Sequence, residues 1–254
     1  MKTSLIAILV AIVAALPSGC SKTPAPPASG PAATVKVLCS TFPMYLFTRN
    51  VTSGREGVQV DLMIPAVMGC PHEYSLTPQD MRKIGAAGVF IANGLGMEEF
   101  LGEPLKQGNA RIVVVDTSAG VGDLIQIEEE HHDGREGTAG HMRHFVPNPH
   151  LFASPRLAAK VVRNIAEGLS KVDPAGAEVY KKNAAAYAAR LERLADEFVA
   201  ATKDLPSKKI VTEHAVFDYL ARDCGLAIVA VVESVIALVS TANLVAASVA
   251  RTFV

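Results

Sequence analysis

The sequence has no excess of charge of either sign. Its 254 residues include 24 Lys and Arg against 25 Asp and Glu, which gives a formal net charge of -1 at pH 7. Proteins that bind nucleic acid carry a basic surface that neutralises phosphates, so nucleic acid is not an expected partner. Apolar residues make up 50% of the chain, which is enough for one sizeable two-lobed domain or two small ones.

Short enzyme motifs are also missing. The chain has no His-Glu-x-x-His sequence, and although Glu73 and Glu213 adjoin histidines, neither is a convincing general base. Residues 93–96 read Asn-Gly-Leu-Gly after an apolar run, but this spacing fits neither of the usual glycine-rich phosphate-binding fingerprints. We therefore expect a tight turn there, and we do not expect an enzyme.

Cysteine is scarce. Besides Cys20 the chain holds Cys39, Cys70 and Cys224, so at most one disulfide can form among these three in an oxidising compartment. Cys39 closes the first predicted strand and Cys70 follows the second, which makes them a candidate pair, but the spacing does not decide the pairing. Cys224 is predicted to be a core residue near a helix end.

Residues 1–20 have the pattern of a secretory signal peptide. Lys2 supplies a short positive region, and Leu5–Leu16 is an apolar stretch too short to span a bilayer. The glycine-cysteine pair that ends at Cys20 resembles the lipobox of bacterial lipoproteins, in which the cysteine is lipidated and becomes the mature N-terminus. The sequence therefore predicts export to the periplasm or cell surface, with a lipid anchor at Cys20 that attaches the protein to a membrane.

Two features follow from this reading of the N-terminus. Pro17 stands where the lipobox usually has an aliphatic residue, so ordinary cleavage and release is the alternative. Residues 21–34 are rich in Pro, Ala, Ser and Gly and have no periodicity, which predicts a flexible, extended tether. A tether fits a protein that is anchored at its N-terminus.

Beyond the tether, short β-branched apolar runs alternate with segments of helical spacing. This pattern predicts an α/β fold with mainly parallel sheets flanked by helices, and ligands at the carboxyl ends of the strands. At ~1.5 Å per residue, the last long helix is about 45 Å long and can brace two lobes. The predicted strands are 35–40, 58–64, 88–92, 111–115 and 209–212, and the predicted helices are 44–52, 78–86, 97–106, 155–171, 173–203 and 215–224. The helix at 78–86 is expected to start with Thr77 as N-cap, Pro78 at the first helical position and Asp80 in the first turn.

The long helix at 173–203 has an apolar stripe. Its members fall at helical spacing on one face, and they are Tyr180, Tyr187, Leu191, Leu194 and Phe198.

Three histidines stand at comparable places in separate segments. His72 follows Pro71 after the second predicted strand, His150 follows Pro149, and His214 follows the strand at 209–212. Three imidazoles that converge in a cleft suit zinc, with a fourth position for a carboxylate or water. A zinc hydrolase has the same ligand pattern, and a tethered interaction domain without metal is the remaining alternative.

The segment 128–144 is the compositional break in the chain. It contains acidic residues, arginines and four histidines with almost no apolar content, which predicts a mobile surface loop. Imidazoles beside carboxylates bind divalent transition metals weakly and without fixed geometry, so the loop can gather metal. A solvated insertion without a role is the alternative on composition alone.

Several motifs in order carry a resemblance to a known family. They are STFPMY, GCPHEYSLTPQD, NGLGMEEFL, the acidic loop with histidines, NPHLFASP, DPAGAEVYKKNAAAYAARL and TEHAVFDYLARDCGL, which together span Val35 to Leu226. With these motifs the chain resembles the metal-binding lipoproteins that deliver zinc or manganese to bacterial ABC importers. The resemblance implies two lobes joined by a rigid helix, a divalent metal ion held between them, and the permease of an ABC importer as partner.

The resemblance also assigns ligands and favours one metal. It implies that His72, His150 and His214 bind the ion. A histidine at position 214 and a histidine-bearing loop are features of the zinc members, whereas manganese members usually have glutamate at the third place. Zinc is therefore the expected metal, and a manganese or iron receptor of the same family is the alternative.

The C-terminal segment departs from the family pattern. Relatives continue with further strands and helices, so the resemblance predicts an incomplete second lobe, and a product with impaired metal binding is an alternative. No fourth ligand is assigned; Asp223 and Glu233 are candidate acids after His214. The apolar stretch 226–250 approaches transmembrane length, but its polar residues and alanines favour a buried strand followed by a covering helix.

The sequence thus predicts a simple order of parts along the chain. The expected boundaries are a lipoprotein-type signal peptide at 1–20, a tether at 21–34, an N-terminal metal-binding lobe at 35–172 that includes the acidic loop, a linking helix at 173–204 and a partial C-terminal lobe at 205–254.

Overall fold

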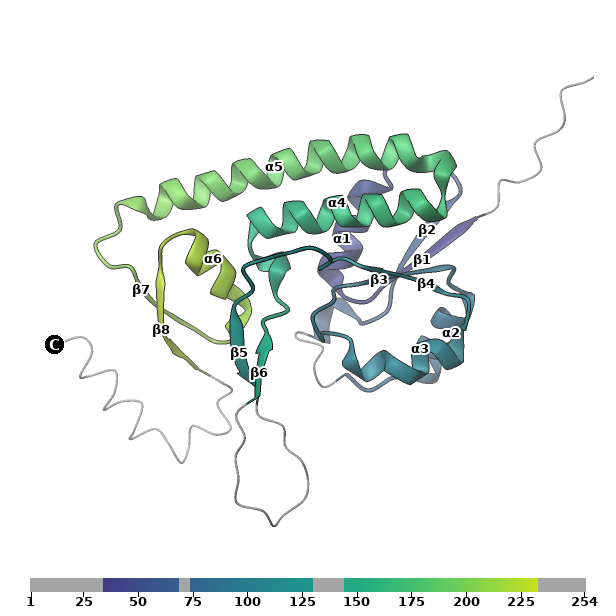
Figure 1. The fold of residues 1–254 in the computed structure, drawn as a ribbon, viewed down its shortest axis with the longest axis horizontal. Helices are drawn as coiled ribbons and strands as arrows, with labels where there is room; N and C mark the ends of the chain where they lie inside the picture. The colour runs from purple at the N-terminus through teal and green to yellow at the C-terminus, as the bar shows by residue number, and fades with distance from the viewer. Residues whose placement is uncertain (1–33, 69–73, 130–143, 233–254) are drawn as a thin grey trace, which may run out of the picture. The chain divides into compact units, whose positions relative to one another are not determined.

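Figure 1 shows the computed structural model, which describes residues 34–68, 74–129 and 144–232. Several predictions fall on the remaining residues. The signal peptide with Cys20, the tether, Cys70 with His72, and most of the acidic segment lie outside the described residues.

The largest sheet in the described part of the chain has four parallel strands (Figure 1). Its strands are β1 (Val35–Cys39), β2 (Val58–Leu62), β3 (Val89–Ala92) and β4 (Val113–Asp116), in the order β2-β1-β3-β4. All pairs are parallel, as the alternation of strands and helices predicted. The order reverses between β1 and β3, and in such sheets the carboxyl ends of the strands at this point form a crevice suited to ligands.

Helices cover the two faces of this sheet with separate cores. The helices are α1 (Phe42–Val51), α2 (Pro78–Ala86), α3 (Gly102–Gly108), α4 (Pro155–Val172) and α5 (Ala177–Lys203). Val37 and Cys39 pack in one core with residues of α1, α4 and α5, whereas Leu38 between them packs in the other core with residues of α2. Alternate residues of a strand point to opposite faces, so β1 contributes to both cores.

The predicted turn after β3 is confirmed. Gly94 and Gly96 have φ angles of 86° and 84°, and Leu95 between them has a φ of 55°. A Cβ added at Gly94 would lie 2.2 Å from an oxygen of Asp116, so glycine is required there. The Glu98 carboxylate accepts hydrogen bonds from the backbone N–H groups of Asn93 and Gly94. The single helix expected over 97–106 is instead a 3₁₀ turn, η3 (Glu99–Leu101), followed by α3.

Helix α5 has a different buried face from the predicted one. It begins at Ala177, after the short turn η5 (Pro174–Gly176). Tyr180 and three alanines are buried, whereas Leu194 and Phe198, which the periodicity placed on the same stripe, are 39% and 38% exposed. The prediction was wrong for the C-terminal half of the stripe. Helix α5 packs mainly against α4 and also against α1, and small buried side chains such as these alanines let helices approach closely.

A second, two-stranded sheet follows α5. Strands β7 (Lys209–Thr212) and β8 (Ala227–Val231) are parallel and are connected by η6 (Ala215–Phe217) and α6 (Asp218–Asp223). A strand was expected here and β8 confirms it, but its residues alternate between exposed and half-buried, so the expectation that it is buried was wrong. The covering helix predicted after it lies outside the described residues. None of the helices in the described part of the chain is long and apolar enough to cross a membrane.

A short antiparallel hairpin was not predicted. Strands β5 (Gln126–Glu129) and β6 (His144–Pro147) pair across the acidic segment. The charged composition of residues 128–144 had favoured a loop over the whole segment. The hairpin matters for the site because β6 leads directly into the residues around His150.

The cysteines described by the structure are buried thiols. Cys39 lies in the sheet core and Cys224 follows the last residue of α6, as predicted for Cys224. Burial raises the pKa of the Cys39 thiol to about 12, so it is protonated and unreactive at neutral pH. The pairing of Cys39 with Cys70 stays a prediction.

Asp173 joins distant parts of the fold through a buried ion pair. Its carboxylate accepts hydrogen bonds from Arg55 Nε at 2.9 Å and Nη2 at 3.1 Å, and from the Tyr180 hydroxyl at 2.6 Å. The side chain of Asp173 is 8% exposed, whereas Arg55 is 24% exposed. The Arg55 hydrogen bonds, supported by Tyr180, hold the pKa of Asp173 below its ordinary value although burial acts in the opposite direction.

This lowered pKa predicts acid sensitivity. The folded state favours the ionised carboxylate, so the stabilisation is present above the unfolded pKa, about 3.9, and is lost as pH falls through the folded pKa. In urea unfolding, we expect Asp173→Asn to be less stable than the wild type at pH 7. The difference in the free energy of unfolding between the two proteins should shrink as the pH falls toward 3. The control is Glu167→Gln, which removes an exposed ion pair with Lys171 and should change little at either pH. A constant gap between Asp173→Asn and wild type would contradict the prediction.

Candidate metal site

Two of the three predicted ligands lie side by side in the structure. His150 follows β6 and precedes the turn η4 (Leu151–Ala153), and its side chain is 1% exposed. His214 follows β7 and precedes η6. The centroids of the two rings are 5.2 Å apart and the ring planes meet at 84°. His72, the third predicted ligand, lies outside the described residues.

The side chain of Asn148 determines which nitrogen of His150 carries the proton. Asn148 Nδ2 is 2.8 Å from the carbonyl oxygen of Ala215, which can only accept, and Asn148 Oδ1 accepts the backbone N–H of His150 at 3.0 Å. These partners fix the orientation of the amide. Because Oδ1 also lies 2.7 Å from His150 Nδ1, that ring nitrogen must donate. His150 Nε2 therefore carries the lone pair and is able to bind a metal.

A closed ring of hydrogen bonds holds the backbone of Asn148. The backbone N–H of Asn148 donates to Ile125 O at 2.8 Å, the N–H of Ile125 donates to the Tyr219 hydroxyl at 3.2 Å, and this hydroxyl donates to Asn148 O at 2.8 Å. Tyr219 comes from α6 and is fully buried in the core. The ring therefore fixes the residues before His150 to the helix that follows His214.

A second polar contact fixes the backbone next to His150. Asn93, at the carboxyl end of β3, donates from Nδ2 to the carbonyl oxygen of Pro149 at 2.9 Å. Glu98 in turn accepts from the backbone of Asn93. Burial raises the pKa of Glu98, against the opposing effect of its hydrogen bonds. The carboxyl end of β3 and the segment that carries His150 are thus directly connected.

Acidic residues near the histidine pair have partners of their own. Asp218 accepts from Asn148 Nδ2 at 3.1 Å; burial raises the pKa of Asp218, although Asn148 and His214 act in the opposite direction. Asp223, named from the sequence as a possible fourth ligand, accepts from Ser154 Oγ at 2.5 Å and lies 3.5 Å from Arg222. It therefore joins α6 to the start of α4. Glu233, the other candidate, lies outside the described residues.

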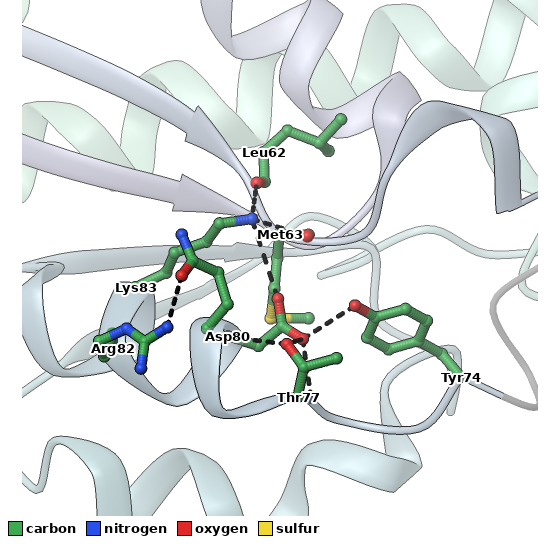
Figure 2. Close-up of polar contacts among 8 residues, drawn as sticks. Leu62, Met63, Tyr74, Thr77, Asp80, Arg82 and Lys83 are labelled. Atoms are coloured by element: carbon green, nitrogen blue, oxygen red, sulfur yellow. Dashed lines mark hydrogen bonds and ion pairs between the residues drawn. The ribbon is translucent and has the colours of Figure 1, made fainter.

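The described residue that follows the His72 segment, Tyr74, is attached to the start of α2 (Figure 2). Thr77 and Asp80 form a reciprocal capping box, with Pro78 at the first helical position, as predicted. The buried Asp80 carboxylate also accepts from the Tyr74 hydroxyl at 2.8 Å. Burial alone would raise the pKa of Asp80, but the hydrogen bonds from Thr77 and Tyr74 and the nearby Lys83 lower it overall.

Lys83 attaches the other flank to the same helix. Its ammonium donates to the carbonyl oxygens of Leu62 at 2.9 Å and Met63 at 3.1 Å, at the end of β2, and lies 3.8 Å from Asp80 (Figure 2). The chain is therefore fixed to α2 both before and after the segment that contains His72. The connection itself, residues 69–73, lies outside the described residues.

Several positioning residues were missed from the sequence. Asn148 stands between Pro147 and Pro149, two residues before His150, and an asparagine there commonly bonds the backbone two residues on. This local signal was available. Tyr219 and Asn93 have no such local signal in the sequence, because their hydrogen bonds join residues far apart in the chain.

The donors present suit a borderline transition metal. Neutral imidazole nitrogen is a typical ligand of zinc, nickel and copper, and a poorer one for manganese. Within the described residues, no three histidine, cysteine or acidic side chains gather in a metal-binding arrangement. The described part of the chain therefore brings two candidate ligands, His150 and His214, next to each other.

Comparisons with known proteins agree with this chemistry. Residues 37–251 match the family model described as the zinc-uptake complex component A, periplasmic, ZnuA. The high-affinity zinc uptake system protein ZnuA of Bacillus subtilis (strain 168) is 34% identical over 191 residues, which cover 75% of this chain and 58% of that protein. This chain therefore spans less than two thirds of the length of that relative.

Solved structures show the same fold. A crystal structure of ZnuA matches with a TM-score of 0.66 and 29% identity, over 78% of this chain and 71% of that one. The Zn(II)-bound structure of AdcA from Streptococcus pneumoniae matches with a TM-score of 0.65 and 28% identity, over 80% of this chain and 40% of that one. The chain belongs to the ZnuA family of periplasmic zinc-uptake components.

Proposed function

We propose that this protein is a zinc-binding receptor that delivers the ion to an ABC importer, with His72, His150 and His214 as ligands. The observation that carries the proposal is the adjacent pair of His150 and His214, in which Asn148 leaves Nε2 of His150 as the lone-pair nitrogen. The relatives named for zinc uptake and zinc binding support the choice of cargo.

The donor types favour zinc over manganese. Imidazole nitrogens from His150 and His214 bind zinc more strongly than manganese, which prefers oxygen ligands. A receptor function is favoured over hydrolysis because the family is described as one of zinc-uptake components. A site that binds and releases its ion needs no general base.

We also propose the cellular placement and order of parts given by the sequence. Residues 1–20 act as the signal peptide, the lipid on Cys20 anchors the protein, and residues 21–34 are the tether. The lobe at 35–172 and the residues from 205 onward each contribute histidines, and the helix at 173–204 connects them. The word periplasmic in the family description supports export.

Zinc binding is testable by thermal unfolding of the metal-free protein. A ligand that binds only the folded state stabilises it by an amount that grows with concentration, about 4 kcal/mol at 1,000 times the Kd. We expect the melting temperature to rise with added zinc and much less with added manganese. A chelator should reverse the rise. An unchanged melting temperature, together with failure to take up zinc in equilibrium dialysis at micromolar concentration, would contradict the proposal.

A further inference from the structure

One side chain contacts both of the segments that carry the histidine pair. Asn148 Oδ1 accepts the backbone N–H of His150 at 3.0 Å and lies 2.7 Å from Nδ1 of the same residue. Asn148 Nδ2 donates to the carbonyl oxygen of Ala215, next to His214, at 2.8 Å, and to Asp218 Oδ2 at 3.1 Å. Asn148 is itself fully buried.

We propose that Asn148 is a positioning residue for the metal cargo. Its oxygen holds His150 in the tautomer with the proton on Nδ1, and its nitrogen fixes the residue after His214. This inference rests on the proposed zinc-binding function, and Asn148 itself does not bind the ion. The two imidazoles are thereby set in place before metal arrives, so less ordering is required when it binds.

The chemistry of the position requires an amide. An aspartate would keep the oxygen that accepts from His150. Its second oxygen would replace the donating Nδ2 and would face Ala215 O and Asp218 Oδ2, which are acceptors, so no hydrogen bond could form there. An alanine would leave the buried N–H of His150 and the carbonyl of Ala215 without this partner, which is unfavourable inside a protein. Only a side chain of this length with one acceptor and one donor end satisfies both groups.

The backbone of Asn148 is held independently of its side chain. The hydrogen bonds through Ile125 and Tyr219 involve only the backbone of residue 148. Substitution of the side chain therefore leaves that ring in place. The effects of Asn148 variants on the histidines can thus be separated from the folding of the segment.

The first test measures the tautomer of His150 in the metal-free, full-length protein. Long-range ¹H–¹⁵N spectra at pH 8, where histidine is neutral, distinguish a protonated from an unprotonated ring nitrogen. The His150 signals are assigned by their absence in His150→Ala. We expect Nδ1–H in the wild type and in Asn148→Asp, and a mixture of tautomers in Asn148→Ala. Nε2–H in the wild type, or an unchanged tautomer in Asn148→Ala, would overturn the inference.

The second test measures zinc affinity by competition with a chromogenic chelator. Loss of a residue that orients a ligand typically weakens metal binding by about 10- to 100-fold, and we expect this for Asn148→Ala. We expect a smaller loss for Asn148→Asp, with partial recovery when Asp218→Asn restores a donor opposite the new carboxylate. Affinities equal to wild type in both single variants would contradict a positioning role.

A matched control separates positioning from stability. Asn183 also uses its amide to donate to two carbonyl oxygens, those of Val51 and Ser53, between α5 and the end of α1. Asn183→Asp should lower the urea midpoint without changing zinc affinity. An equal loss of affinity in this variant would assign the Asn148 effect to general destabilisation. If the wild type itself binds no zinc, the proposed function fails, while the tautomer measurement still decides whether Asn148 orients His150.

Discussion

Zinc affinity is expected to fall by more than about 100-fold when either His150 or His214 is replaced by alanine. A residue that merely orients a ligand already accounts for 10- to 100-fold, and removal of the ligand itself takes away a metal bond. His150 and His214 lie with ring centroids 5.2 Å apart, so each substitution leaves a single imidazole of the pair. The same loss is expected for His72→Ala if His72 completes the site.

The measurement is equilibrium competition for zinc, with circular dichroism to show that the helices persist. The control is His144→Ala, which removes a histidine from β6 on the same hairpin, together with deletion of residues 130–143. Both should change the equilibrium affinity much less, because the predicted role of that segment is capture of the ion. A variant of His150 or His214 with wild-type affinity would remove that residue from the site.

Tyr219→Ala is expected to have the largest effect on stability. The ring is fully buried in the main core and the hydroxyl links Ile125 to Asn148. Removal of a buried aromatic side chain typically destabilises a protein by about 3–5 kcal/mol. Tyr219→Phe keeps the ring and loses only the hydroxyl, so we expect about 1–3 kcal/mol from the unsatisfied N–H and C=O groups.

Urea unfolding of both variants at pH 7 measures these effects. Tyr187→Phe is the control, because it removes a hydroxyl from a half-buried tyrosine that packs edge-on against Phe47 in the same core. It should cost less than Tyr219→Phe. Equal stabilities for the two phenylalanine variants would mean that the hydrogen-bond ring around Asn148 contributes little.

Local patterns were sufficient to predict most of the fold. The β-branched run at 35–40 and the sequence Thr77-Pro78-Gln79-Asp80 predicted β1 and the start of α2, because strand propensity, proline at the first helical position and capping act within a few residues. The alternation of such elements predicted the parallel sheet. Likewise, the comparable places of His150 and His214 in separate segments predicted that their imidazoles would converge, and the two rings lie side by side.

Contacts between distant residues set the limits of the prediction. The stripe on α5 was drawn from spacing alone, and Leu194 and Phe198 proved exposed because the helix packs through its alanines. The hairpin of β5 and β6 was missed because cross-strand pairing depends on a partner that the composition does not reveal. Asn148 joins His150 to Ala215 through a hydrogen bond that spans 67 positions in the chain, which no local pattern encodes.

A crystal structure of the zinc-soaked protein, with anomalous scattering collected at the zinc edge, tests the central claim most directly. We predict one strong peak within about 2.0–2.1 Å of a ring nitrogen of His150 and of His214, the usual zinc–nitrogen distance, with Nε2 as the ligand atom of His150 and His72 as the third ligand. A zinc peak away from His150 and His214, or one bound to Nδ1 of His150, would contradict it.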